Sequence, residues 1–251
     1  MTASLLHRAV TRDHWIGRGL RWPLDRLSVN AVLPVLSGPL FLRRWIVGAG
    51  LHRCWLGTYE REKQRALSKI LSRGMVVCDI GANTGFYTLL MSRRVGREGH
   101  VHAFEPSPGN LAFLRQHMAL NKVSNATVHG EALSDGVGQA FFDTSPGSYQ
   151  GRLDPKGRTP VSVTTLDHLW EQGALPPVDL LKIDIEGAEA GALRGGERLL
   201  RRFRPTLFLA THGVETHREC CRLLRSFGYR VQSLDGNTRV EETDELIASN
   251  R

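Results

Sequence analysis

An apolar run that ends in an acid and then turns on two glycines is the feature that most constrains the fold of this chain. The run Val76–Ile80 contains Asp79 and leads into Gly81-Ala82-Asn83-Thr84-Gly85 and then a helix-like stretch. This order is typical of a buried parallel strand that delivers a nucleotide-like ligand to a helix N-terminus. Gly81 and Gly85 have no Cβ, so the backbone can turn sharply and approach a ligand closely.

The spacing of this turn argues against two common phosphate sites. A dinucleotide fingerprint requires G-x-G-x-x-G, and a P-loop requires a lysine followed by Ser or Thr. The turn here reads G-x-N-x-G after an acid and has no lysine, which also disfavours a nicotinamide-dependent oxidoreductase. A carboxylate suits a ligand with hydroxyls or a cationic amine, so S-adenosylmethionine is the candidate. The predicted binding residues of this turn are Asp79, Gly81, Ala82, Asn83 and Gly85.

Strand-like and helix-like segments alternate after residue 58, which predicts an α/β fold built on a parallel sheet. The expected strands are Val76–Ile80, His100–Phe104, Ala126–His129, Val178–Asp184 and Thr206–Ala210. The expected helices are Tyr59–Leu71, Phe86–Val95, Pro108–Leu120, Glu189–Arg202 and Glu215–Phe227. Two further strand pairs are expected, Phe141–Phe142 with Val161–Thr165 and Tyr229–Leu234 with Arg239–Glu242. A loop at Ser145–Gly157 would help to shape the acceptor pocket.

Two more turns at the carboxyl ends of strands complete the predicted ligand site. Glu105 follows Gly85 by 20 residues and ends the second strand, where Rossmann-like folds place an acid that binds both ribose hydroxyls. Pro106 stiffens the turn after it. After the third strand, Glu131 could accept the adenine amino group, and the backbone of Ala132 could read the ring edge. The alternatives are a helix cap at Glu105 and a solvated loop at Glu131.

Charged residues at the end of the fourth strand predict the reacting edge. Alternation places Lys182, Asp184 and Glu186 on one face of a strand that should be apolar on both. Such groups are costly to bury unless they pair or serve a site. His212, after the fifth strand, is a further candidate base. The alternative for Lys182 is a buried pair with one carboxylate that orients the loop.

The basic character of the chain lies in its N-terminal segment. Residues 1–57 hold eight arginines, no lysine and two acids, which is +6 of the formal net charge of +8. We expect a basic extension of short helices, broken by Pro23, Pro34 and Pro39, before a domain at residues 58–251. Its charge could serve a peripheral membrane or other anionic contact, or simply be solvated.

The cysteines and the hydropathy bear on the compartment. No apolar run reaches the ~20 residues that a membrane helix needs. The four cysteines form no C-x-x-C pair, which indicates free thiols in a reducing compartment and predicts a cytoplasmic protein. They are Cys54, Cys78, Cys220 and Cys221.

The joint order of these motifs resembles the FkbM-type methyltransferases over roughly residues 55–212. The motifs that carry the resemblance are WLGTYERE, CDIGANTGFYT, GHVHAFEPSP, ALSD, VTTLDHL, VDLLKIDIEGAEAGALRGGERLL and RPTLFLATHG. The resemblance implies a class I, Rossmann-like fold, with a seven-stranded mostly parallel sheet, an antiparallel last strand and helices on both faces. It implies S-adenosylmethionine as cofactor, with Asp184 near both cofactor and acceptor. Many relatives have an acid where this chain has Thr211-His212, which leaves the general base open.

Methyl transfer to a hydroxyl of a small molecule, sugar or secondary metabolite is the predicted reaction. We expect Asp184, Glu186, His212 and Lys182 to form the catalytic group, with one of the first three removing the hydroxyl proton. A divalent metal on Asp184 and Glu186 is possible, but two convergent acids are too few to favour it, so no metal ligands are predicted.

Two alternatives to this reaction stay open at the level of the sequence. Methylation of a nucleic-acid base or amide nitrogen is the weaker reading, because Asp184-Ile185-Glu186-Gly187 has neither the prolines nor the aromatic residue that such enzymes carry there. A non-catalytic binding protein that kept the fold is the other. The sequence does not indicate an oligomeric state.

Overall fold

The computed structural model describes residues 27–144 and 151–250, which form two compact units. One unit ends at Tyr59 and the other begins at Glu60. Part of the predicted loop Ser145–Gly157 and of the predicted basic extension therefore lies outside the described residues. Among the described residues, no helix combines the length and the apolar character needed to cross a membrane.

The described part of the N-terminal unit differs from the expected run of short helices. Strands β1 (Val32–Pro34) and β2 (Arg44–Ile46) form an antiparallel pair, and only α3 (His52–Leu56) is helical. Valine, isoleucine and tryptophan side chains favour strands, and Gly38 takes a φ of 77° in the segment between them. Pro34 therefore ends a strand and Pro39 lies between two strands, whereas the sequence predicted that these prolines break helices.

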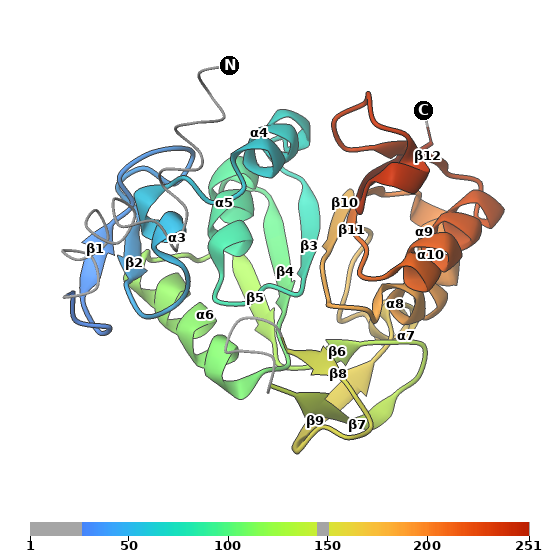
Figure 1. Cartoon of the computed structure of the whole chain (residues 1–251), viewed down its shortest axis with the longest axis horizontal. Helices are drawn as coiled ribbons and strands as arrows, with labels where there is room; N and C mark the ends of the chain where they lie inside the picture. The colour runs from blue at the N-terminus through green and yellow to red at the C-terminus, as the bar shows by residue number, and fades with distance from the viewer. Residues whose placement is uncertain (1–26, 145–150, 251) are drawn as a thin grey trace. The chain divides into compact units, whose positions relative to one another are not determined.

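The second unit is built on a seven-stranded sheet (Figure 1). Its strands are β3 (Val76–Ile80), β4 (His100–Phe104), β5 (Ala126–His129), β10 (Leu180–Ile183), β11 (Thr206–Ala210), β12 (Arg230–Ser233) and β13 (Glu245–Ser249). Their order is β12-β13-β11-β10-β3-β4-β5, and β13 runs antiparallel to both of its neighbours. The chain leaves β3 toward β4 on one side and returns at β10 on the other, so the crevice at this switch point is where such sheets bind ligands.

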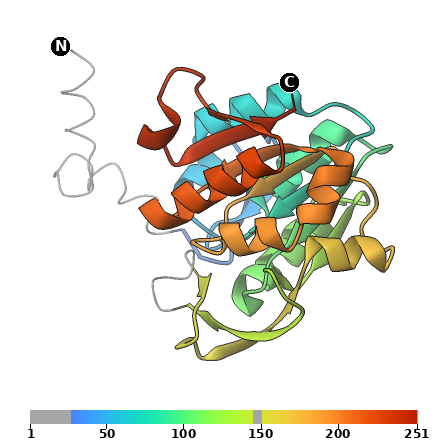
Figure 2. The same cartoon turned by 90° about the vertical axis from the view of Figure 1, so that its right-hand side faces the viewer.

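Helices cover both faces of this sheet (Figures 1 and 2). The helices are α4 (Arg61–Ile70), α5 (Phe86–Val95), α6 (Pro108–Leu120), α7 (Leu166–Glu171), α8 (Glu189–Arg194), α9 (Glu197–Phe203) and α10 (Val214–Ser226). Helices α5 and α6 lie on one face, and α8, α9 and α10 lie on the other. This three-layer arrangement matches the predicted fold class, including the antiparallel last strand.

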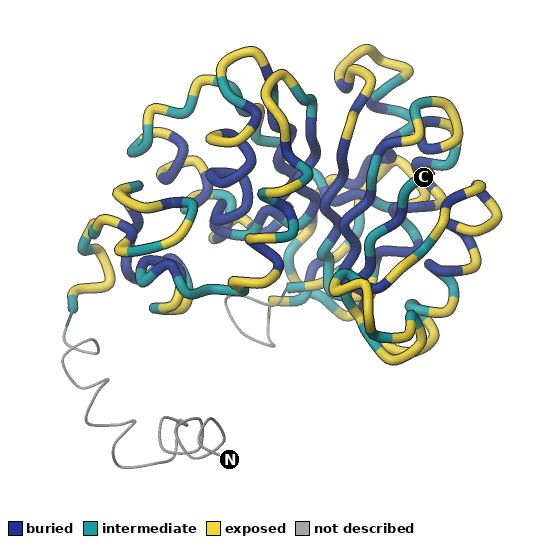
Figure 3. The backbone as a smooth tube through the Cα atoms, turned by 90° about the horizontal axis from the view of Figure 1, so that it is seen from above, coloured by how far each residue is buried: buried dark blue, intermediate teal, exposed yellow. Residues whose placement is uncertain are grey.

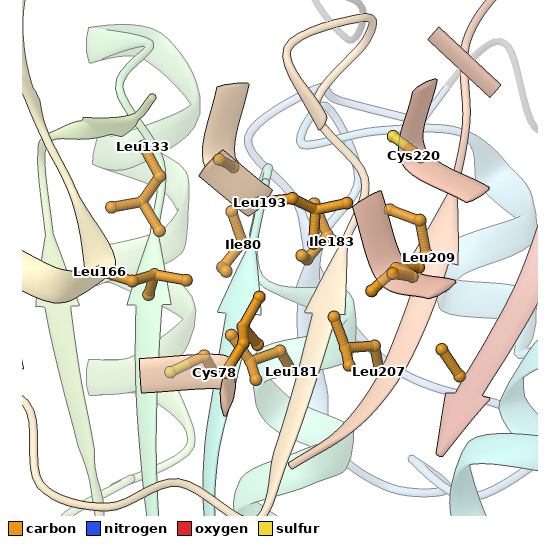
Figure 4. Close-up of a cluster of buried hydrophobic side chains, with 14 of the residues drawn as sticks. Cys78, Ile80, Leu133, Leu166, Leu181, Ile183, Leu193, Leu207, Leu209 and Cys220 are labelled. Atoms are coloured by element: carbon orange, nitrogen blue, oxygen red, sulfur yellow. The ribbon is translucent and has the colours of Figure 1, made fainter. Parts of the chain in front are cut away.

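The core lies between the central strands and the helices of the second face. Leu181 and Ile183 of β10 and Leu207 and Leu209 of β11 belong to one hydrophobic cluster with Leu193 of α8 (Figure 4). The central strands are buried along their length, whereas the exposed residues lie in the outer turns and helix surfaces (Figure 3). All four cysteines are buried and free. The strands after which the predicted site residues follow are thus packed in this core.

A smaller four-stranded sheet is inserted between β5 and β10. Its strands, in the order β6-β9-β7-β8, are β6 (Ala132–Leu133), β9 (Thr159–Thr164), β7 (Gly138–Asp143) and β8 (Arg152–Leu153). The antiparallel pairing of β7 with β9 confirms the predicted pair, with Phe142 opposite Thr159.

In the second unit, two predicted elements were wrong. The helix expected at Glu189–Arg202 is broken into α8 and α9 at Gly195 and Gly196. The backbone packs so closely on Ser134 there that a Cβ on Gly195 would lie 2.0 Å from its carbonyl oxygen. The strand expected at Arg239–Glu242 is instead a short 3-10 helix, η1 (Val240–Glu242), with no buried residue. The last strand is β13, whose Leu246 and Ala248 are buried.

Candidate active site

The turn after β3 has the backbone geometry that its glycines predicted. Gly81, Asn83 and Gly85 have φ values of 78°, 50° and 98°, so two of the three left-handed positions are glycines. The backbone amides of Gly81 and Ala82 both donate to the carbonyl oxygen of Phe104, at 3.0 and 2.9 Å. The turn therefore packs against the end of β4 and leads directly into α5.

Glu105 ties the turns after β3 and β4 together. Its carboxylate oxygens accept hydrogen bonds from the backbone amides of Asn83, at 2.7 Å, and Ser107, at 2.9 Å. Burial raises the pKa of Glu105, and these hydrogen bonds oppose that shift. Pro106, half-buried, lies between Glu105 and α6. The side chain of Asn110 also donates to Glu105. The carboxylate has four lone pairs, so one remains for a ligand hydroxyl.

Asp79 and Lys182 form a buried ion pair. The Lys182 Nζ lies 3.0 Å from one oxygen of Asp79 and donates to the carbonyl oxygen of Gly81 at 3.1 Å. The hydroxyl of Thr88 donates to the other oxygen of Asp79 at 2.6 Å. The side chains of Asp79 and Lys182 are 0% and 6% exposed. This geometry favours the alternative in which Lys182 forms a buried pair with a carboxylate and orients the loop.

Glu131 and Ala132 lie at the far end of the same edge. Glu131 follows β5, and its charge acts on the imidazole of His129. Ala132 belongs to β6 and is in register with Val163 of β9. Their roles beside an adenine stay predictions.

Asp184, Glu186 and His212 converge at the carboxyl ends of β10 and β11. The Nε2 of His212 lies 3.8 Å from an oxygen of Asp184 and 3.5 Å from an oxygen of Glu186. One potential ligand atom from each of the three residues lies within 4.8 Å of the others. Their side chains are only partly exposed, at 25%, 32% and 35% in chain order. This cluster could bind a hydroxylated acceptor, a proton or a metal ion.

Glu189 holds this cluster from behind. Its Oε1 accepts from the Nδ1 of His212 at 2.8 Å and from the backbone amides of Ile185, at 3.3 Å, and Gly187, at 3.0 Å. Glu186 sits in that turn with a left-handed φ of 53°, a conformation that costs a non-glycine residue energy and is typical of functional sites. Glu189 thus fixes both the imidazole and the turn that presents Glu186.

The protonation of the cluster follows from these contacts. The hydrogen bond that His212 donates to Glu189 raises the pKa of His212 to about 9, and the charges of Glu186 and Asp184 add to that shift. Burial raises the pKa of Glu186. Burial alone would also raise that of Asp184, but Lys182 and Lys63 outweigh it and lower the pKa.

Lys63 is a site residue that the sequence reasoning missed. From α4 its Nζ contacts Glu245 at 2.6 Å, Asp184 at 3.4 Å and Glu60 at 3.5 Å. Although burial would lower it, these carboxylates raise the pKa of Lys63. Glu60 also accepts from the hydroxyl of Tyr87 at 2.6 Å.

Only some of these missed residues left a signal in the sequence. Lys63 shares the buried face of α4 with Gln64 and Leu67, and a lysine on such a face is an unusual feature. Glu189 had been assigned only to the start of a helix. Glu245 becomes visible only once β13 is placed beside β11, where it lies opposite Ala210.

Comparisons with known proteins agree with this geometry. A family model described as "Methyltransferase FkbM domain" matches residues 79–231, which is more than half of the chain. Methyltransferase 1 of Beauveria bassiana is 29% identical over 143 residues, covering 47% of this chain and 57% of that protein. Hexuronic acid methyltransferase AglP of Haloferax volcanii is 26% identical over 139 residues, covering 54% of this chain and 56% of that protein. The chain thus spans a little over half the length of these curated relatives.

A solved structure supports the fold. The crystal structure of methyltransferase FkbM from Methylobacillus flagellatus KT aligns with a TM-score of 0.51 and 19% identity, over 70% of this chain and 43% of that chain. At this identity the likeness concerns the fold alone. Together with the strand order, it confirms the predicted Rossmann-like architecture.

Proposed function

Because this chain belongs to the FkbM methyltransferase family, we propose that it transfers a methyl group from S-adenosylmethionine to a hydroxyl oxygen of a small molecule or sugar. The observation that carries the proposal is the convergence of Asp184, Glu186 and His212 beside the turn after β3. A Cβ on Gly81 would lie 1.9 Å from the carbonyl oxygen of Asp184, so the backbones of the two regions are in contact. A donor on one and an acceptor on the other would therefore meet.

The donor half has groups that suit S-adenosylmethionine, which supplies a methyl group on a positively charged sulfur. Glu105 can accept from a ribose hydroxyl, because two backbone amides and the side chain of Asn110 engage three of the four lone pairs of its carboxylate. Gly81 and Gly85 leave the backbone of the turn open to close approach. Asp79 and Lys182 would act by fixing the shape of that turn, since neither side chain is exposed.

In the acceptor half, the chain must orient the hydroxyl and remove its proton. The new O–CH3 bond forms as the O–H and S–CH3 bonds break, with the sulfur keeping its electron pair. Positioning is the main requirement of such an in-line displacement. Glu186 is partly exposed and can take the proton, while Asp184 and His212 hold the oxygen in place.

A sugar acceptor is supported by one relative and by the chemistry of the cluster. The relative named for hexuronic acids is 26% identical over its matched part. Carboxylate and imidazole groups are suited to hydrogen bonds with sugar hydroxyls. We therefore place hexoses and hexuronic acids first among the candidate acceptors.

The test is transfer of a labelled methyl group from S-adenosylmethionine by the purified protein. The acceptor panel holds hexosides, hexuronic acids and phenols, with primary amines and oligonucleotides as contrasting classes. We expect label in an O-methyl group of a hydroxylated acceptor, identified by mass spectrometry. Label only in amines or oligonucleotides would contradict the proposal, and failure to bind S-adenosylmethionine in calorimetry would remove its basis.

A further inference from the structure

We propose that Asp184, Glu186 and His212 form a binding site for one divalent cation of the Mn²⁺ to Zn²⁺ series, which would hold the acceptor. The role of the cation in the reaction rests on the proposed function. The binding of the cation rests only on the geometry of the three side chains. The sequence offered two carboxylates, which did not favour a metal. The structure adds an imidazole to them, and one potential ligand atom from each residue lies within 4.8 Å of the others.

The three side chains have the chemistry and spacing of a metal site with open positions. Nitrogen and oxygen atoms separated by 3.5 and 3.8 Å can share one cation at about 2.0–2.6 Å, the range of metal bonds to these ligands. Carboxylates suit Mg²⁺ and Mn²⁺, whereas imidazole suits later metals. Three protein ligands leave coordination positions for a substrate oxygen. All three side chains are partly exposed, so that oxygen can reach the cation.

Glu189 is an independent observation that points the same way. Histidines that bind metals usually donate their other ring nitrogen to a carboxylate, which fixes the tautomer and the ring orientation. Here the Nδ1 of His212 donates to Glu189, and the Nε2 is thereby directed toward Asp184 and Glu186. Glu189 is 0% exposed, and no described residue donates to its Oε2. A fully buried carboxylate thus stands behind the imidazole.

The charge balance of the region calls for a cation. Among the described residues of the connected network, six carboxylates face two lysines and the imidazolium of His212. The carboxylates are Glu60, Asp79, Asp184, Glu186, Glu189 and Glu245, and the lysines are Lys63 and Lys182. Lys182 is engaged with Asp79, and the Nζ of Lys63 lies nearest to Glu245. Asp184, Glu186 and Glu189 share His212, and of these three only Asp184 also lies near Lys63. Negative charge therefore remains in excess there, where buried charges must be compensated.

A cation here would do two things for the reaction. It would bind the acceptor oxygen and lower the pKa of that hydroxyl, as metals do for bound water. It would also allow an acidic sugar to approach a region that otherwise repels anions. One oxygen of Glu186 would bind the cation, and the other would take the proton that the acceptor loses.

Binding is tested with Mn²⁺ alone, so that no acceptor is needed. Protein freed of metals by chelation is titrated with MnCl₂ and followed by electron paramagnetic resonance and calorimetry. We expect one Mn²⁺ per chain, with Kd below about 1 mM. Asp184→Asn, Glu186→Gln and His212→Gln should each weaken binding at least tenfold. Glu189→Gln should weaken it by about 10- to 100-fold, the effect of altering a group behind a metal-bound histidine.

The controls separate loss of the site from loss of the fold. Glu171→Gln removes a carboxylate of α7 that pairs with Arg198 outside this cluster, and it should leave Mn²⁺ binding unchanged. S-adenosylmethionine binding, measured in every variant, reports that the donor half is folded. Absence of Mn²⁺ binding by the wild type, or equal binding by folded variants, would overturn the site. O-methylation that survives chelation would overturn its role while leaving the proposed function intact.

Discussion

The proposed donor half and the proposed acceptor half of the site both contain carboxylates, but these carboxylates differ in how fully they are paired with cations and hydrogen-bond donors. In the donor half, the Asp79 carboxylate is paired with Lys182 and Thr88, and Glu105 receives two backbone amides. In the acceptor half, Asp184 and Glu186 face each other across His212, and the carboxylates outnumber their cationic partners. Carboxylates whose hydrogen-bond partners are all within the protein fix the shape of the proposed donor turn, whereas those of the proposed acceptor edge remain available to a ligand.

Breaking the ion pair of the proposed donor half should cause the greatest loss of stability. Lys182→Met leaves the Asp79 carboxylate buried with its cationic partner removed, which costs about 3–5 kcal/mol of unfolding free energy. The double variant with Asp79→Asn should recover part of that loss, because no uncompensated charge remains. Denaturant unfolding measures both. A loss below about 1 kcal/mol in the single variant would mean that Asp79 is not held by this pair.

The acceptor half should lose activity while keeping stability. Glu186→Gln removes the proton acceptor at almost constant shape, and we expect kcat to fall by about 100-fold or more. The affinity for S-adenosylmethionine and the unfolding free energy should stay near their wild-type values, because the Glu186 side chain is partly exposed. Single-turnover transfer of the labelled methyl group measures the catalytic rate, and calorimetry measures the affinity for S-adenosylmethionine. If the affinity for S-adenosylmethionine fell by as large a factor as kcat, the distinction between the two halves would be contradicted.

The donor half should also be sensitive to acid. Burial lowers the pKa of His117 to about 4 from an ordinary value of 6.5, and its Nδ1 donates to the carbonyl oxygen of Thr84 at 2.6 Å. As the pH falls, His117 is therefore protonated in the unfolded chain at a higher pH than in the folded chain. Stability should decrease as pH falls from 6.5 to 4, by about 3 kcal/mol at most from this group.

The variant His117→Gln isolates that contribution. Its amide can still donate to Thr84 but does not titrate, so the stability loss between pH 6.5 and 4 should become shallower. His102, whose pKa burial also lowers to about 4, is retained and should account for part of the remaining slope. Thermal unfolding across this pH range in both proteins gives the comparison, and identical slopes would exclude His117 as a source.

The smallest expected effect concerns the ribose contact. Glu105→Gln keeps the size of the side chain but turns one of its two acceptor oxygens into a donor. We expect the Kd for S-adenosylmethionine to rise about tenfold, in keeping with a hydrogen bond to a charged group. Calorimetric titration measures it. An unchanged Kd would assign Glu105 to holding Asn83 and Ser107 only.

The sequence was most informative where one local pattern determined the outcome. The strand Val76–Ile80 and the helix Pro108–Leu120 have the predicted bounds, because apolar runs and a proline at the helix start mark their ends. The single helix expected at Glu189–Arg202 was wrong, since the close approach of Gly195 to Ser134 is a tertiary contact. Local signals carry no information about such neighbours.

The same limit applies to the candidate site. Asp184, Glu186 and His212 were predicted together because the carboxyl ends of adjacent parallel strands meet at one edge. Lys63 and Glu245 were missed because they enter from α4 and β13, whose places follow only from the complete topology. The pairing of Asp79 with Lys182 required the register of β3 beside β10, in which these two residues lie opposite each other.

The contact of Gly81 with Asp184 has a consequence for how such enzymes diversify. Because main chain touches main chain there, the distance between the proposed donor and acceptor sites is set by the backbone. Side chains that follow β10 and β11 can then be exchanged without resetting that span. Acceptor preference can therefore change in evolution, or be altered by grafting the turns after β10 and β11, while the distance between the two sites stays the same.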